Sequence, residues 1–229
     1  MSKIDNKRIR AQRILSTLDS LYPNAECELN YTTEFELLVA VILSAQCTDK
    51  RVNEVTKTLF AIANTPSQFA QMEQETLEKL IFSCGFYRNK AKNIINASKD
   101  IVARFDGKVP EDFDQLLSLS GVGRKTANVM VAEAFKKQAI AVDTHVFRTA
   151  NRLALAKGKT PFEVEKGLRE VLDESVYAHS HHLLIFHGRY TCKSQRPQCE
   201  NCPLSTDCEY YAQQNKAKNH KEKIIEVTA

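Results

Sequence analysis

The sequence has 229 residues, with 32 Lys and Arg against 28 Asp and Glu, and therefore a formal net charge of +4. Hydrophobic residues make up 43% of it and charged residues 26%, an ordinary globular composition that excludes disorder for the body of the chain. Only seven Gly and six Pro are present, and regularly spaced strands and turns are missing. This composition argues against an all-β sandwich or barrel and favours an all-α fold.

The expected cellular compartment is inferred from two features that are missing from the sequence, a membrane span and a secretory signal. The longest apolar run, Leu37 to Leu43, is too short to span a bilayer, and the first residues lack the apolar core of a secretory signal. We therefore expect a cytoplasmic protein without membrane contact. In a reducing compartment its seven cysteines would be thiols or metal ligands rather than disulfides.

Helical signals recur in chain order. Thr33 and Glu36 predict a capping box before a buried helix, and Thr65-Pro66 predicts the start of another. Gly85 is expected to end a helix in the left-handed conformation, and Gly107 to follow the end of the next. Two further starts are predicted at Asp143, as an N-cap, and at the capping box Thr160–Glu163. Apolar residues at helical spacing place helices around 37–43, 52–60, 77–81, 91–105, 113–117, 124–134, 143–153 and 161–171.

Four of the cysteines fall within one short stretch, namely Cys192, Cys199, Cys202 and Cys208. Four thiolates so close in sequence can surround one tetrahedral metal ion or one iron–sulfur cluster. Only Cys199 and Cys202 have the Cys-x-x-Cys spacing of a zinc knuckle, so spacing alone leaves both metals open. The remaining three, which fall in predicted helices, are interpreted as buried small hydrophobic residues: Cys27, Cys47 and Cys84.

A glycine-containing hairpin, Leu119-Ser-Gly-Val-Gly-Arg-Lys-Thr126, joins two predicted helices. Glycines let a large partner approach the main chain, and the N–H groups of the following helical turn attract an anion such as a backbone phosphate. The candidate DNA contacts are therefore Gly121, Val122, Gly123 and Arg124. The alternative is a tight helical connection followed by a solvated Arg-Lys pair.

Lys125 lies in the first turn after this hairpin, where the positive helix end and Arg124 both disfavour an ammonium group. Such a lysine can act as a nucleophilic amine. Asp143 supplies a carboxylate at a predicted helix start, and considered alone it is most simply a cap. In the cysteine-rich stretch, Lys193 and Arg196 either meet phosphates or are merely solvated. Packing or hydrogen bonding is the interpretation for the histidines at 179, 181, 182 and 187.

Together these motifs resemble the endonuclease III family of helix-hairpin-helix DNA glycosylases. The resemblance rests on residues 119–129, 141–148, 187–192 and the four-cysteine pattern, supported by Leu43–Gln46 and Asn89–Ala91, and it covers residues 5 to 211. This sequence departs from the family pattern at Ser120, which often is proline, at the additional thiol of Cys47, and in a longer tail.

The resemblance implies two helical lobes with a DNA cleft between them. Residues 27–138 would form a six-helix barrel containing the helix-hairpin-helix, residues 1–26 with 139–211 a lobe holding a 4Fe–4S cluster, and residues 212–229 a flexible polar tail. The cluster ligands would be the four clustered cysteines. We expect a monomer, of bacterial type and used at the nucleoid, whose partner is double-stranded DNA with damaged bases or abasic sites.

The resemblance also implies a bifunctional DNA glycosylase and AP lyase of base excision repair, acting on oxidised pyrimidines. Lys125 would attack the sugar and form a Schiff base, Asp143 would assist it, and β-elimination would cut the strand. Gln46 would fill the space vacated by the extruded nucleotide, with Phe86 as its partner wedge; Phe86 could otherwise be a core aromatic residue.

Two alternatives stay open from the sequence. One is a glycosylase of the same superfamily for mismatched adenine or oxidised guanine, although adenine-specific relatives usually carry an added C-terminal domain and lack the hairpin lysine. The other is a non-catalytic, zinc-containing DNA-binding module, whose colourless protein would differ from a yellow-brown iron–sulfur protein.

Overall fold

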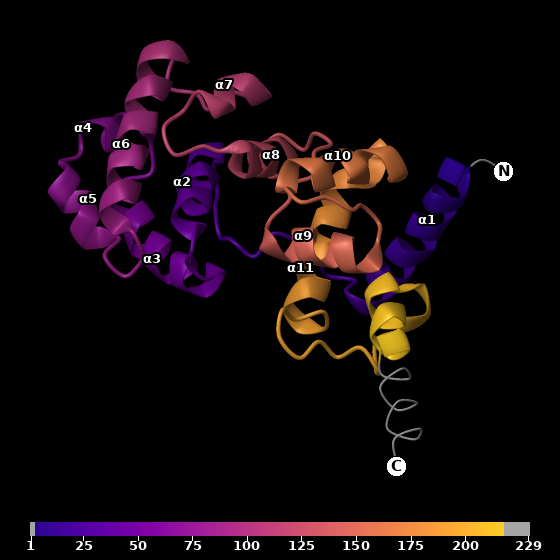
Figure 1. The fold of residues 1–229 in the computed structure, drawn as a ribbon. Coiled ribbons are helices and arrows are strands. Elements are labelled where there is room, and N and C mark those ends of the chain that lie inside the picture. The colour runs from indigo at the N-terminus through magenta and orange to yellow at the C-terminus, as the bar shows by residue number, and fades with distance from the viewer. Residues whose placement is uncertain (1–2, 218–229) are drawn as a thin grey trace. The chain divides into compact units, whose positions relative to one another are not determined.

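The structure is a computed structural model that describes residues 3–217, and all regular secondary structure in that range is helical (Figure 1). The all-α prediction is confirmed. Within the same range no helix is both long enough and apolar enough to cross a membrane. The chain divides into two compact units, which we call the hairpin unit, residues 27–139, and the cysteine unit, residues 1–26 with 140–229.

The hairpin unit is built on a buried helix. Its elements are α2 (Glu34–Ser44), α3 (Asp49–Ile62), α4 (Pro66–Gln71), α5 (Gln74–Leu80), α6 (Tyr87–Arg104), α7 (Phe113–Leu117) and α8 (Arg124–Glu133). Residues 35–43 of α2 are all buried, and α3, α6 and α8 pack against that helix. An apolar run of this length leaves no face for water, which explains why the sequence shows no amphipathic stripe there.

Side-chain caps set several helix starts as predicted. Thr65 and Gln68 form a reciprocal capping box at α4, with Pro66 in the first turn. At α2, Thr33 accepts from the Glu36 amide, but the Glu36 carboxylate accepts from the amide and hydroxyl of Thr32 instead of closing on Thr33. The predicted box is therefore wrong in its second half, because the buried carboxylate reaches one residue further back.

The prediction for Gly85 is also wrong. Helix α5 ends at Leu80, several residues earlier, and Gly85 is not among the glycines with positive φ. The left-handed residue is its neighbour Phe86, with φ of 57°, which directly precedes α6. Gly107, in contrast, follows α6 with φ of +72°, and its amide donates to the Ile101 carbonyl at 3.0 Å. That helix ending is confirmed.

The cysteine unit is organised around its last long helix. Its elements are α1 (Lys3–Leu21), α9 (Thr144–Leu153), α10 (Pro161–Val171), the 3-10 turn η1 (Glu174–Val176), α11 (Tyr177–Tyr190) and the 3-10 turn η2 (Ser205–Asp207), followed by a helical stretch over 209–217. Of the predicted polar tail, residues 212–217 are thus helical and residues 218–229 lie outside the described part. Helix α11 packs against both α9 and α1.

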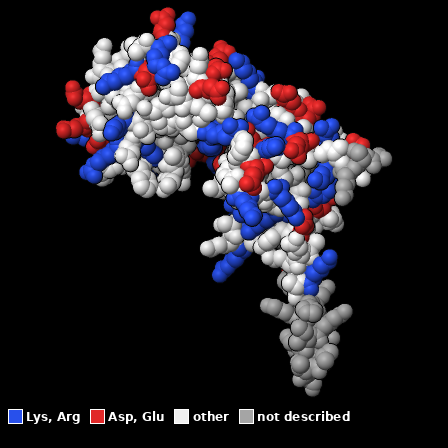
Figure 2. All heavy atoms as spheres, turned by 45° about the horizontal axis from the view of Figure 1, so that its top comes forward, with Lys and Arg blue, Asp and Glu red and all other residues white. Residues whose placement is uncertain are grey.

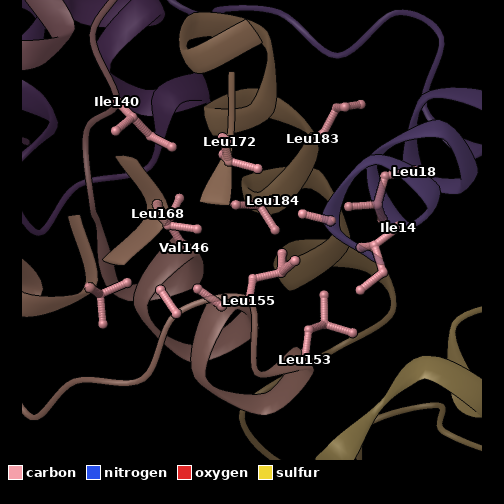
Figure 3. Close-up of a cluster of buried hydrophobic side chains, with 14 of the residues drawn as sticks. Ile14, Leu18, Ile140, Val146, Leu153, Leu155, Leu168, Leu172, Leu183 and Leu184 are labelled. Carbon is pink, nitrogen blue, oxygen red and sulfur yellow. The ribbon is translucent and has the colours of Figure 1, made fainter. Parts of the chain in front are cut away.

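The apolar core of this unit joins both ends of the chain. Ile14 and Leu18 of α1 meet Val146 and Leu153 of α9 and Leu184 of α11 (Figure 3). All five side chains are 0–1% exposed. Because α1 closes this core, residues from the start of the sequence stabilise the segment that carries the clustered cysteines.

Gly188 marks the closest approach of α11 to α9. A Cβ atom at this position would lie 2.9 Å from the Cβ of His145 and 3.2 Å from the Arg148 guanidinium. The packing of these two helices therefore depends on the missing side chain.

We expect Gly188→Ala to lower the free energy of unfolding by about 1–3 kcal/mol, because overpacking at the contact outweighs the better helix propensity of alanine. Urea unfolding followed by circular dichroism measures this change. An unchanged or higher midpoint would show that α9 and α11 can separate without cost.

Candidate active site and cysteine centre

The hairpin between α7 and α8 has one glycine that the fold requires. Gly121 has φ of +79°, and a Cβ atom there would lie 2.8 Å from the Cβ of Asn93. Both conformation and space therefore exclude a larger residue. The next residue, Val122, is buried, and its amide donates to the Leu119 carbonyl at 3.1 Å, which closes the turn.

Gly123 is different, because the fold itself does not require it. Its φ of −94° suits any residue, and a Cβ atom there would have no neighbour within 4 Å. Gly123 is the N-cap of α8 and supplies no side-chain acceptor to the first turn. The main chain at this helix start is thus accessible to an external acceptor.

Lys125 is exposed and lies in the first turn of α8. Its neighbour Arg124 places the guanidinium 5.1 Å from the centre of the Phe113 ring, on the opposite helix of the hairpin. This cation–π contact fixes Arg124 across the turn. The predicted nucleophile thus follows a hairpin whose shape is held by Gly121 and by a stacked arginine.

Asp143 caps α9, as predicted. Its Oδ1 accepts hydrogen bonds from the amides of His145 and Val146, both at 2.8 Å. The residue is half-buried and belongs to the cysteine unit, whereas Lys125 belongs to the hairpin unit. The cap function fixes the carboxylate in place and leaves it able to interact with a positive charge.

Gln46 and Phe86 lie on two adjoining turns of the hairpin unit. Both side chains are exposed, and both residues adopt the left-handed conformation, with φ of 55° and 57°. The turns are close, since a Cβ atom on Gly85 would lie 3.5 Å from the Gln46 carbonyl oxygen. Phe86 is 64% exposed, so its alternative interpretation as a core aromatic residue is wrong.

The four clustered cysteines line one pocket of the cysteine unit: Cys192, Cys199, Cys202 and Cys208. The amide of Cys202 donates to the Cys199 carbonyl at 3.2 Å, which forms a tight turn between these two ligands. Burial, followed by the charges of neighbouring cysteines, raises the pKa of Cys199. Among the residues described, no three His, Cys, Asp or Glu side chains converge closely enough to hold a single metal ion.

Two arginines of α9 hold this cysteine segment, and the sequence analysis missed both. Arg148 donates from Nε to the Cys192 carbonyl at 2.9 Å and from a terminal nitrogen to the Gly188 carbonyl at 2.7 Å. Arg152 donates to the carbonyls of Lys193 and Ser194 at 2.7 and 3.1 Å. Arg148 and Arg152 are four residues apart on α9, so both side chains lie on one face of that helix. This spacing was the signal that the sequence offered for a shared role.

The histidines are held as predicted. The Nδ1 atom of His181 lies 2.7 Å from the Ala141 carbonyl, and His179 Nε2 lies 2.6 Å from the Asp19 carboxylate. His187 is buried beside Tyr22, and its burial lowers its pKa to about 4. It is therefore neutral at pH 7 and acts as a packing residue.

Lys193 and Arg196 are exposed in the segment between the first two clustered cysteines. The backbone of Arg196 is in the left-handed conformation, with φ of 49°. Basic and acidic side chains are interspersed on the face drawn in Figure 2, as the net charge of +4 leads one to expect. Local placement, and not total charge, must therefore direct any contact with a phosphate.

The three other cysteines match their prediction only in part, since burial is confirmed for Cys84 alone. Only Cys84 is buried; Cys27 and Cys47 are half-buried. All three lie outside the helices, in the connections before α2, after α2 and after α5. The interpretation as buried helical residues is wrong for Cys27 and Cys47, because turn residues are solvated on at least one side.

Comparison with known proteins explains this arrangement. The family model for HhH-GPD superfamily base excision DNA repair proteins matches residues 39–174, which include α8 and its hairpin. The chain is 50% identical over 189 residues to endonuclease III of Rickettsia conorii, covering 82% of this chain and 90% of that protein. It is 44% identical over 205 residues to endonuclease III of Escherichia coli, covering 90% and 97%.

A solved structure of a trapped endonuclease III–DNA covalent intermediate is similar as well. It is 45% identical in sequence, with a TM-score of 0.87, and the match covers 90% of this chain and 98% of that one. The chain therefore belongs to the helix-hairpin-helix superfamily of base excision DNA repair proteins and, within it, to the endonuclease III family.

The cap function of Asp143 can be tested by two substitutions. Asp143→Ala removes both cap hydrogen bonds of α9 and should lower the free energy of unfolding by about 1 kcal/mol. Asp143→Asn keeps a side-chain acceptor and should lower the free energy of unfolding much less. Chemical unfolding of the two variants beside the parent measures the difference, and an Asp143→Ala variant as stable as the parent would mean that the cap contributes nothing.

Proposed function

We propose that this protein is a bifunctional DNA glycosylase and AP lyase of base excision repair that removes oxidised pyrimidines from duplex DNA. The observation that carries the proposal is the position of Lys125, an exposed amine in the first turn of α8, directly after the glycine hairpin. Endonuclease III, at 45% identity, forms a covalent intermediate with DNA, and a lysine supplies the amine that such chemistry needs.

A base inside a duplex must be extruded before it can react, at a cost of a few kcal/mol that is smaller for a damaged pair. Gln46 and Phe86 are suited to this step. Both are exposed and lie on adjoining turns, so an amide group and an aromatic ring can enter the base stack together. Gln46 fills the vacated position, and Phe86 wedges the opposite side.

Lys125 then acts on the sugar. Its neutral amine attacks the anomeric carbon, the bond from that carbon to the base breaks, and the base leaves with the bonding electrons. Loss of a proton and opening of the ring give a Schiff base between Lys125 and the sugar. The Schiff base acidifies the adjacent sugar proton, whose loss breaks the bond to the 3′ phosphate oxygen by β-elimination.

Asp143 acts on the same nucleotide, as the family resemblance implies. Its carboxylate is oriented by two amide hydrogen bonds and stabilises the positive charge that develops on the sugar ring. It also accepts or returns the proton that the amine must lose. Lys125 supplies the covalent bond, and Asp143 supplies the opposing charge.

The DNA backbone is held at the hairpin. The amides of Gly121 and Gly123 and of the start of α8 bind one phosphate, because Gly123 leaves open space beside the main chain, whereas the Val122 amide is used inside the turn. Arg124 adds a cation at the same helix start, and the exposed Lys193 and Arg196 contact a phosphate further along the duplex.

We infer that the cysteine unit holds a 4Fe–4S cluster. Its four ligands are the cysteines that line one pocket, Cys192, Cys199, Cys202 and Cys208. A single zinc ion needs four donors around one point, whereas a cluster bonds each thiolate at a separate iron. The choice of the cluster rests on the resemblance to the endonuclease III family, and the shared pocket supports a common site for the four thiols. With all four ligands from protein, its role is structural and electrostatic.

Borohydride reduction should trap Lys125 on DNA that contains an oxidised pyrimidine, giving a covalent complex that migrates as one species in denaturing gels. Lys125→Ala should abolish trapping, whereas Lys108→Ala, an exposed lysine of the same unit, should trap like the parent. Asp143→Asn should bind the same duplex but react more slowly, by about 10²-fold or more. Equal trapping by the parent and Lys125→Ala would refute the mechanism.

Cys199→Ser should lose most of the iron and acid-labile sulfide of the purified protein and its yellow-brown colour, because a hydroxyl is a poor substitute for a thiolate ligand. Iron and zinc analysis with visible absorption measures this. Cys27→Ser, at a half-buried thiol of the other unit, is the matched control and should keep the colour. A colourless parent protein with bound zinc would overturn the cluster.

A further inference from the structure

Two cysteines that take no part in the proposed chemistry lie on adjoining turns of the hairpin unit. Cys47 follows α2 and Cys84 follows α5, so residues far apart in sequence come together through two turns. The turns are in contact, because a Cβ atom on Gly85, next to Cys84, would lie 3.5 Å from the carbonyl oxygen of Gln46, next to Cys47. Cys84 is 0% exposed, whereas Cys47 is half-buried and can be reached by a small molecule.

Each thiol is next to a residue of the proposed wedge. Cys47 directly follows Gln46, and Cys84 is separated from Phe86 only by Gly85. The main chain of Gly85 is already close to the Gln46 carbonyl. A covalent bond between the sulfurs would therefore connect the two turns that present Gln46 and Phe86.

Two basic side chains lie near Cys47 and Cys84. Lys90 of α6 is 5% exposed and donates from Nζ to the Leu43 carbonyl at 2.9 Å, at the end of α2. Lys90 and Arg51 both favour a thiolate at Cys84, but burial outweighs them and raises the pKa of Cys84 to about 11. Cys84 thus stays a thiol, and the half-buried Cys47 is the partner that meets an oxidant first.

We propose that Cys47 and Cys84 are a peroxide-oxidisable thiol pair whose reversible disulfide locks the turns that carry Gln46 and Phe86. Hydrogen peroxide transfers one oxygen to the Cys47 sulfur, giving a sulfenic acid and water. The Cys84 sulfur then displaces the hydroxyl group, its proton leaves with that hydroxyl as a second water, and the disulfide forms. In total, two thiols are oxidised and one peroxide is reduced to two waters.

The consequence for DNA rests on the proposed function. A disulfide holds its two sulfur atoms about 2.05 Å apart, closer than any non-bonded contact, so its formation draws the two turns together. The turns then lose the spacing that lets Gln46 and Phe86 enter the base stack. In a reducing compartment thiols restore the open form, so the disulfide is transient.

The holoenzyme is reduced, treated with hydrogen peroxide, alkylated, and mapped as non-reduced peptides by mass spectrometry. We expect a Cys47–Cys84 linked peptide that has lost two hydrogen atoms and disappears on treatment with dithiothreitol. Affinity for a duplex containing a tetrahydrofuran abasic-site analogue, measured by fluorescence anisotropy, should fall by about fivefold or more and return on reduction.

Cys47→Ser separates this effect from damage to the metal centre, since it keeps all four clustered cysteines. It should form no linked peptide and keep its affinity under the same peroxide treatment, whereas Cys27→Ser should respond like the parent. An equal loss of affinity in Cys47→Ser, or a parent protein without the linked peptide, would overturn the proposal. If the reduced parent fails to bind the duplex, the proposed function fails, while the peptide map still decides whether the disulfide forms.

Discussion

The cysteine unit depends on the hydrogen bonds that Arg148 and Arg152 donate to main-chain carbonyls. Residues 191–204 have no regular secondary structure, so their carbonyls need donors from elsewhere. The two guanidinium groups supply them from one face of α9, each worth about 1.5–3 kcal/mol as a hydrogen bond to a charged group. The same helix begins at Asp143. One helix thus fixes a proposed catalytic carboxylate and the segment that bears the cysteines.

Basic residues near the start of the chain serve the fold as well. Arg10 donates to the carbonyls of Leu153, Ala154 and Asp207, and Arg13 pairs with the Asp207 carboxylate. These contacts fasten α1 to the end of α9 and to the turn before Cys208. They also lower the pKa of Asp207. The positive charges of Arg10 and Arg13 are therefore used inside the unit.

Sequence signals that act within a few residues predicted helix starts and ends, whereas features that depend on tertiary contacts were not predicted. Thr65, Asp143 and Gly107 act through neighbours within a few residues, so their caps and ends could be foreseen. Helix α11 was not predicted, because it is buried around most of its circumference and shows no amphipathic stripe. The spacing of Arg148 and Arg152 indicates a shared helix face, but their acceptors lie 40 or more positions away, and the spacing does not identify them.

Gln46 and Phe86 both hold a left-handed backbone although neither is glycine. That conformation costs about 1–2 kcal/mol for each residue, and the surrounding turns must enforce it. This cost is part of the free energy of folding and is not added when DNA binds. The main chain of the proposed wedge is therefore preorganised: its two turns are set before any duplex binds, so ordering them adds no backbone entropy cost at that step.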